Sequence, residues 1–139
     1  MKSKMKIIFL GIVVASMIPT TSAFASEVQS FWWKTLADYN ATISTEAHMT
    51  GEYKSNGGDY RVCVYNIRSG NTMTVSLYEI DPGLLFERIG SRKGIKAPSG
   101  CAIWNGLNSW IDGSNKKAEL NTKIASETGR DSVRVIIQD

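Results

Sequence analysis

Alternation of apolar and polar residues between closely spaced turn sequences is the feature that most constrains the fold of this chain. The clearest example is 118–124, where Ala118, Leu120, Thr122 and Ile124 alternate with Glu119, Asn121 and Lys123. A period of two places each set of side chains on its own face of a β-strand. No segment of helical length with a period near 3.6 lies between the turns. The pattern therefore predicts an all-β chain.

The rest of the chain divides into similar short segments. Strands are predicted at 41–49, 60–67, 72–80 and 133–137, whereas 84–89 and 102–111 fit either a strand or a short helical segment. The segment 60–67 is apolar on both faces, which predicts an interior strand. Ser69-Gly70-Asn71 predicts a three-residue hairpin. About seven strands with short turns predict a single antiparallel β-sandwich, either immunoglobulin-like or jelly-roll-like.

The composition favours the same fold class. From residue 26 onward the chain has ten Ile, six Val and eight Thr against six Leu. β-Branched side chains lose rotamer freedom in a helix and fit a pleated sheet, so this balance is typical of strands.

The first 25 residues have the order of a secretory signal peptide. Three lysines precede an apolar run at 7–18, and small residues then lead to Ala23-Phe24-Ala25. This order predicts a signal peptide at 1–25, cleavage after Ala25, and one domain at 26–139. The apolar run is too short to span a bilayer comfortably, so no transmembrane span is predicted. We expect a secreted bacterial protein, with the periplasm as the alternative location.

Cleavage would also change the charge of the protein. The full chain has 16 Lys and Arg against 13 Asp and Glu, a net charge of +3. Three of the lysines belong to the predicted signal peptide, so the domain would be neutral. A neutral domain has no general electrostatic attraction for nucleic acid, and we predict no nucleic-acid partner.

Two cysteines, Cys63 and Cys101, remain after the predicted cleavage. An even pair in an exported protein predicts a disulfide bond. The bond would close a loop of about 39 residues, which contributes roughly 4 kcal/mol in the chain-entropy model.

No convincing catalytic constellation emerges from the sequence. His48 is the single histidine and lies in a predicted strand beside Glu46. The carboxylate pairs Glu46 with Glu52 and Glu79 with Asp81 could serve a glycosidase, but solvated surface charge explains them better. The turn at 112–115 clusters oxygen ligands without the spacing of an EF-hand loop. We therefore predict a non-enzyme with no cofactor and no metal.

Two features remain as candidate binding sites. Trp32 and Trp33 follow Phe31, and three adjacent aromatics cannot all face one core. The second feature is a cluster of four cations with no acid among them: Arg88, Arg92, Lys93 and Lys96. Most of them lie in the segment 90–100, which its glycines and cations predict to be the longest loop, tethered by Cys101.

These features favour a secreted, non-enzymatic domain that binds an extracellular or envelope partner. A membrane-active or antagonistic small toxin is the alternative, because a tryptophan pair and a cationic loop could contact lipid. A hydrolase that uses paired carboxylates is the second alternative. Neither the partner nor the oligomeric state follows from the residues.

Overall fold

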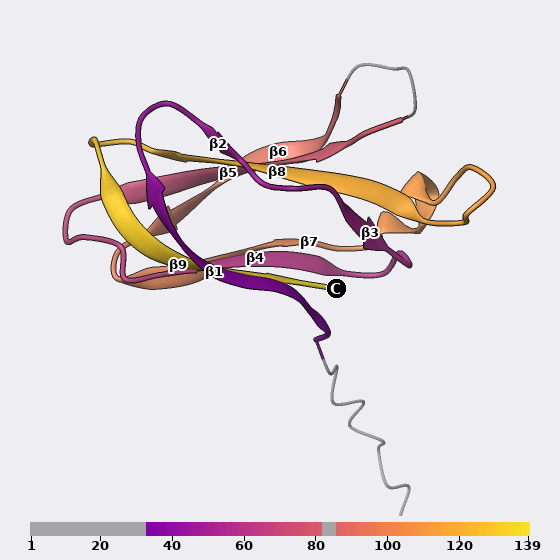
Figure 1. The fold of residues 1–139 in the computed structure, drawn as a ribbon, viewed down its shortest axis with the longest axis horizontal. Helices are drawn as coiled ribbons and strands as arrows, with labels where there is room; N and C mark the ends of the chain where they lie inside the picture. Colours follow the sequence, from indigo (N-terminus) through magenta and orange to yellow (C-terminus); the bar gives the residue numbers. More distant parts are fainter. Residues whose placement is uncertain (1–32, 82–85) are drawn as a thin grey trace, which may run out of the picture. The chain divides into compact units, whose positions relative to one another are not determined.

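A computed structural model describes residues 33–81 and 86–139 of the chain (Figure 1), all within one compact unit. The predicted signal peptide and Trp32 lie outside the described residues. The elements are β1 (Thr35–Ile43), β2 (His48–Met49), β3 (Tyr53–Ser55), β4 (Tyr60–Tyr65), β5 (Thr72–Glu79), β6 (Glu87–Lys96), β7 (Ser99–Trp104), the 3-10 helix η1 (Leu107–Trp110), β8 (Ala118–Ser126) and β9 (Asp131–Gln138). The described part contains no α-helix, which confirms the predicted fold class.

The strands form two antiparallel sheets that lie as two layers in Figure 1. The first sheet has the order β1-β9-β4-β7, and the second has the order β2-β8-β5-β6 with β3 also paired to β8. Within the described part, only β5 and β6 are both consecutive in sequence and hydrogen-bonded to each other. Most other connections carry the chain from one sheet to the other. This arrangement is the jelly roll, one of the two predicted architectures.

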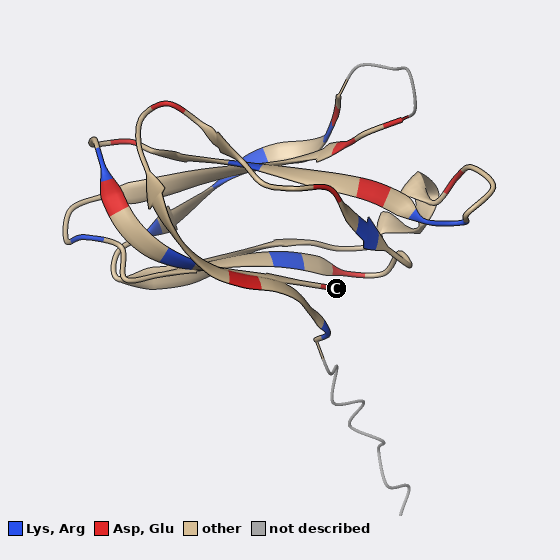
Figure 2. Cartoon of the chain, in the orientation of Figure 1, with Lys and Arg blue, Asp and Glu red and all other residues tan. Residues whose placement is uncertain are grey.

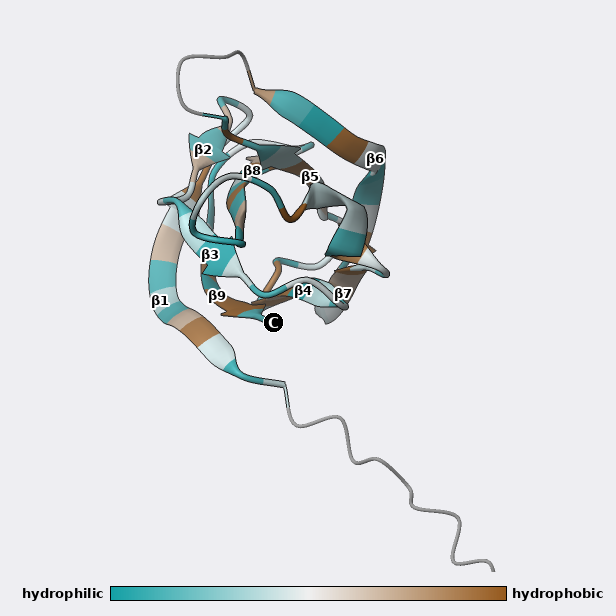
Figure 3. Cartoon of the chain, turned by 90° about the vertical axis from the view of Figure 1, so that its right-hand side faces the viewer, coloured by the Kyte–Doolittle hydropathy of each residue, from teal (hydrophilic) through white to brown (hydrophobic). Residues whose placement is uncertain are grey.

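The core lies between the two sheets. In β5, which lies within the strand predicted at 72–80, the alternate apolar residues Met73, Val75 and Leu77 are fully buried. In β8, Leu120 and Ile124 of the apolar set are buried and Lys123 is exposed, but Glu119 and Asn121 of the polar set are buried as well, so the predicted alternation holds only in part. Figure 3 shows the two sheets from the end of the sandwich, surrounding the space that the apolar side chains fill.

The disulfide Cys63–Cys101 forms as predicted. The two cysteines are directly opposite each other on β4 and β7, with their Cα atoms 4.0 Å apart. The bond therefore joins neighbouring strands of one sheet. Strand β4 lies between β9 and β7, which agrees with the predicted interior position.

The prediction of a long loop at 90–100 is wrong. Residues Glu87–Lys96 form β6 and Ser99–Trp104 form β7, so only a tight turn at Ala97-Pro98 separates two strands. Strand β6 is an edge strand that pairs only with β5 in its sheet. Charged side chains, lysine in particular, are common on edge strands because they discourage further strand pairing. The cations of this segment therefore fit an edge strand as well as a loop.

Two other predictions are corrected by the sheet topology. The turn at Ser69–Asn71 closes no hairpin, because β4 and β5 belong to different sheets. The strand predicted at 41–49 is wrong in its bounds, since β1 spans Thr35–Ile43 and the chain bends before β2. At this bend the chain passes between the sheets, and the alternation of residues continues through it without a break. The ambiguous segment 102–111 contains the end of β7 followed by η1.

Candidate functional site

The predicted cations occupy both sides of strand β6. Met73, Val75 and Leu77 point inward, so the intervening residues of β5 face outward. Directly paired residues share a face. Arg88 pairs with Tyr78 and Lys96 with Thr72, and both cations therefore lie on the outer face of the β2-β8-β5-β6 sheet.

Lys93 departs from this arrangement. It pairs with the inward-facing Val75, and its Nζ lies 5.5 Å from the centroid of the Trp104 ring. A register shift in the β5–β6 pairing separates Lys93 from the preceding residues of its strand. The structure thus splits the predicted patch, with Arg88, Arg92 and Lys96 outside and Lys93 against an aromatic ring of the facing sheet.

Arg92 lines a shallow groove on the outer face together with Lys123 of β8. The volume of this groove is about 240 Å³. The other residues that line it are small or carry hydroxyl groups: Thr45, Ala47, Thr74, Ser76 and Ala125. Two cations beside threonine and serine hydroxyls form an environment for an anionic group that also accepts or donates hydrogen bonds.

An apolar hollow adjoins this groove and shares Lys123 with it. Met49, Tyr78 and Phe86 line the hollow. Phe86 is 54% exposed, and its ring contacts Tyr78 edge to face with centroids 6.2 Å apart. Exposed aromatic side chains at a groove are typical of surfaces that bind a partner. We call the groove and the hollow together the outer-face site.

The sequence did not identify the part of this site that lies outside β6. Lys123 was predicted to face away from the core, but nothing in its segment indicated which strand would lie beside it. Pairing of Ser76 with Lys123 and of Tyr78 with Asn121 brings β8 against β5. Only this register places Lys123 beside Arg92.

The predicted aromatic site is described only at Trp33, since Phe31 and Trp32 lie outside the described residues. Trp33 is half-buried, and the Arg61 guanidinium lies 4.2 Å from the centroid of its ring. Arg61 also donates a hydrogen bond of 2.6 Å from Nε to Oε1 of Gln138. Trp33 therefore covers the outer face of the other sheet, in a cation–π contact.

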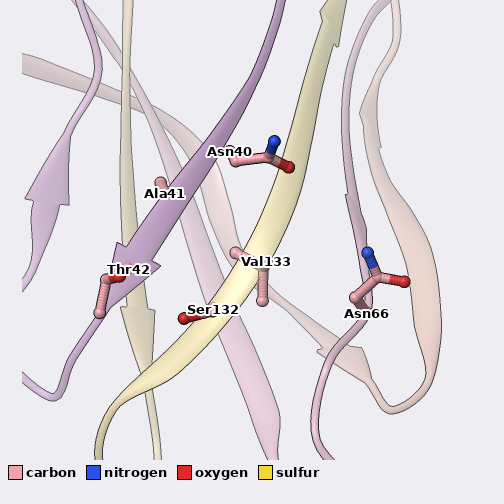
Figure 4. A pocket seen from close by; sticks show the side chains of 6 residues that line it. All are labelled: Asn40, Ala41, Thr42, Asn66, Ser132 and Val133. Atoms are coloured by element: carbon pink, nitrogen blue, oxygen red, sulfur yellow. The ribbon is translucent and has the colours of Figure 1, made fainter.

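A third hollow lies between β1, β9 and the residue that follows β4. Figure 4 shows the side chains that line it, and its volume is about 230 Å³. All six are uncharged: Asn40, Ala41, Thr42, Asn66, Ser132 and Val133. No titratable group lines this hollow, so we assign it no chemistry.

The residues considered for catalysis are not assembled into a catalytic site. His48 lies on β2 with its ring centroid 6.3 Å from that of Tyr39, and Cys63 and Cys101 are oxidised. Glu46 and Glu52 are exposed. Glu79 is buried at the end of β5, and this burial, together with the repulsion of nearby carboxylates, raises its pKa to about 7.

The fold and the outer-face site define an all-β jelly-roll domain with a cationic and aromatic sheet face. The sequence profile of the family described as "YndA coiled coil domain" matches residues 35–137, and the chain belongs to this family. A relative described as "Uncharacterized protein YndA", from Bacillus subtilis (strain 168), is 31% identical over 120 residues. This alignment covers 81% of the chain and 82% of the relative.

A solved structure supports the fold. The Yersinia pseudotuberculosis-derived mitogen aligns with a TM-score of 0.51 at 15% identity, over 73% of this chain and 83% of the mitogen. A coiled coil requires helices with apolar heptads. The described residues of this chain contain strands and one 3-10 helix, so the words "coiled coil" do not describe this fold. In the same ranges, no helix is both long enough and apolar enough to cross a membrane.

Proposed function

We propose that this chain is a secreted, non-enzymatic binding domain whose outer-face site binds an extended anionic polymer of the cell envelope. The observation that carries the proposal is the position of Arg92 and Lys123, which line one groove from two different strands. Phe86 and Tyr78 lie at the adjoining hollow, where an apolar or sugar-like part of the polymer would pack.

The shape of the site favours an extended partner. The outward cations of β6 run from Arg88, opposite Tyr78, to Lys96, opposite Thr72. Six residue steps along β5 separate these two positions, which is about 20 Å at roughly 3.3 Å per residue. A row of cations of this length matches a polymer with repeated negative charges better than a small anion. The jelly-roll fold by itself supports no particular function.

Binding to purified anionic wall polymer tests the proposal. We expect the double substitution Arg92→Gln with Lys123→Gln to weaken binding roughly fivefold at low salt, since each exposed charge contact is worth up to about 1 kcal/mol. The difference should shrink at about 0.5 M salt, where exposed charges are screened. Phe86→Ala should weaken binding at both salt concentrations, because its contact is apolar.

The matched control is Lys34→Gln with Arg130→Gln. Lys34 and Arg130 are exposed and line neither the groove nor the hollow. Their replacement removes the same charge as the test variant. Equal binding by the two double variants would contradict the proposal. Leakage of dye from anionic vesicles would instead favour the membrane-active alternative.

Export is a separate part of the proposal and rests on the leader pattern at 1–25. Mass spectrometry of the culture supernatant should find a chain that begins at Ser26 and is about two mass units lighter than its reduced form. A mature chain that retains the apolar run at 7–18 would contradict export by cleavage.

A further inference from the structure

Three carboxylates from separate parts of the chain meet at the end of the sandwich. Glu79 is the last residue of β5, Asp112 follows η1, and Glu119 is the second residue of β8. One oxygen of each carboxylate lies within 4.8 Å of the others. Figure 2 shows acidic segments gathered toward the end of the sandwich where β8 begins and β5 ends.

The pairing of β5 with β8 brings the backbones of Glu79 and Glu119 close together. Glu79 pairs with Leu120, next to Glu119, and the N–H of Ile80 donates to the carbonyl of Glu119. Glu79 also lies directly opposite Glu87 on β6. Two like charges in opposite positions of a β-ladder destabilise it. The fold therefore concentrates negative charge at this end of the sheet.

Glu79 is the residue that points to a ligand. It is only 4% exposed, and its buried Oε1 has no hydrogen-bond partner. A buried carboxylate without a partner costs several kcal/mol unless it takes up a proton or a cation neutralises it. In the described ranges, the one ion pair joins Arg134 to Asp38, far from this cluster in the sheet order.

Two lysines lie beside the cluster, Lys54 opposite Glu119 and Lys117 opposite Asp112, and neither forms an ion pair with it. The Lys117 ammonium donates a hydrogen bond to the side-chain oxygen of Asn56. Asn115 donates to one oxygen of Glu119, which leaves the second oxygen available.

We propose that Glu79, Asp112 and Glu119 bind a divalent cation, and that the cation is calcium. Carboxylate oxygens without histidine or thiolate ligands suit Ca²⁺, Mg²⁺ or Mn²⁺ better than zinc. Calcium accepts six to eight oxygens at about 2.3–2.6 Å in flexible geometry, so two of its ligands can be about 5 Å apart. The carboxylate oxygens of Glu79, Asp112 and Glu119 lie within 4.8 Å of one another, which fits this span.

The exposure of the three residues fits such a site. Glu79 and Glu119 are buried, whereas Asp112 is exposed and leaves a side open to solvent. Water could complete the coordination on that side, and the ion could enter there. A bound ion would also tie the turn after η1 to β5 and β8. Calcium should therefore stabilise the folded chain.

The test compares the melting temperature of the purified protein in EDTA and in about 5 mM CaCl₂, a concentration above the roughly 0.1–1 mM dissociation constants of extracellular calcium modules. We expect calcium to raise the melting temperature of the wild-type protein by several degrees. Calorimetric titration of the same protein with CaCl₂ should show one saturable site.

The variants Glu79→Gln and Asp112→Asn should lose this shift in melting temperature. The control is Glu46→Gln, which should keep the shift, because Glu46 is exposed in the connection between β1 and β2. Asp112→Asn changes an exposed residue, so it gives an answer even if the Glu79 variant fails to fold. A wild-type melting temperature that is equal in EDTA and CaCl₂ would overturn the proposal, as would full shifts in both variants. An equal shift with MgCl₂ would overturn the assignment to calcium.

Discussion

The Asn71 side chain donates a hydrogen bond of 2.9 Å to Oδ2 of Asp131, and both residues are buried. Asn71 precedes β5 in one sheet, and Asp131 begins β9 in the other. The Asn71 amide also donates to Oγ of Ser126, and its Oδ1 accepts from the N–H of Thr72 and the hydroxyl of Thr128. One buried amide thus joins the two sheets at this end of the sandwich.

We expect Asn71→Ala to lower the free energy of unfolding by roughly 2–4 kcal/mol, because it removes a hydrogen bond to the buried Asp131 carboxylate and the amide partner of Ser126 and Thr128. Burial opposes ionisation of Asp131, but hydrogen bonds from Asn71 and the Arg68 N–H still hold its pKa below the usual range. Urea denaturation measures the change. Asn40→Ala is the control, because Asn40 is exposed, and a similar loss in both variants would contradict this role for Asn71.

The buried Glu79 predicts an unusual pH dependence in the metal-free protein. Its pKa rises from 4.5 to about 7 on folding, so the folded state binds more protons between these pH values. The free energy of unfolding should therefore fall as the pH rises from 4.5 to 7, by about 3 kcal/mol.

Urea denaturation in EDTA at several pH values measures this dependence. Glu79→Gln carries no charge at either end of the range and should lose this part of the slope. A wild-type protein with the same pH dependence as Glu79→Gln would show that Glu79 titrates normally.

Loss of the disulfide should lower stability strongly. Replacing Cys63 and Cys101 by serine removes a covalent link between residues 38 positions apart. The chain-entropy model predicts a loss of about 4 kcal/mol, a large part of the stability of a domain of this size. Chemical denaturation with and without reductant measures it. An unchanged midpoint in the double variant would mean that the bond contributes little to stability.

Two adjacent glycines lie in the turn before β4, and substitution of each by alanine compares the cost of backbone strain alone with the cost of strain plus a steric clash. Gly57 and Gly58 both have positive φ, at 90° and 83°. A Cβ at position 58 would meet nothing within 4 Å, whereas at position 57 it would lie 2.5 Å from Oδ1 of Asn108. This oxygen also accepts the N–H of Gly58, so it cannot move without loss of that bond.

We expect Gly58→Ala to cost about 1 kcal/mol and Gly57→Ala about 3 kcal/mol in free energy of unfolding. Thermal or urea denaturation of the two variants provides the comparison. Equal effects would show that the turn moves away from η1 at little cost.

The outer-face site shows why the sequence predicted only part of the binding surface. Arg88, Arg92, Lys93 and Lys96 form a cluster that is visible in the sequence because they are close together along it. Lys123 and Met49 are distant in sequence, and their relation to β6 depends on which strand lies beside which. The same limit applies to Glu79 and Asp112, which lie in separate segments of the sequence and meet only in the folded chain.

The sequence alone determined the class of fold, the alternating core positions and the disulfide. Alternation with a period of two fixes which side chains face inward, as in Met73, Val75 and Leu77, because it depends only on neighbouring residues. The tertiary structure decided that 90–100 contains strand rather than loop, and that β5 lies between β6 and β8. Sheet order and register follow from contacts between residues far apart in the chain, and no local pattern records them.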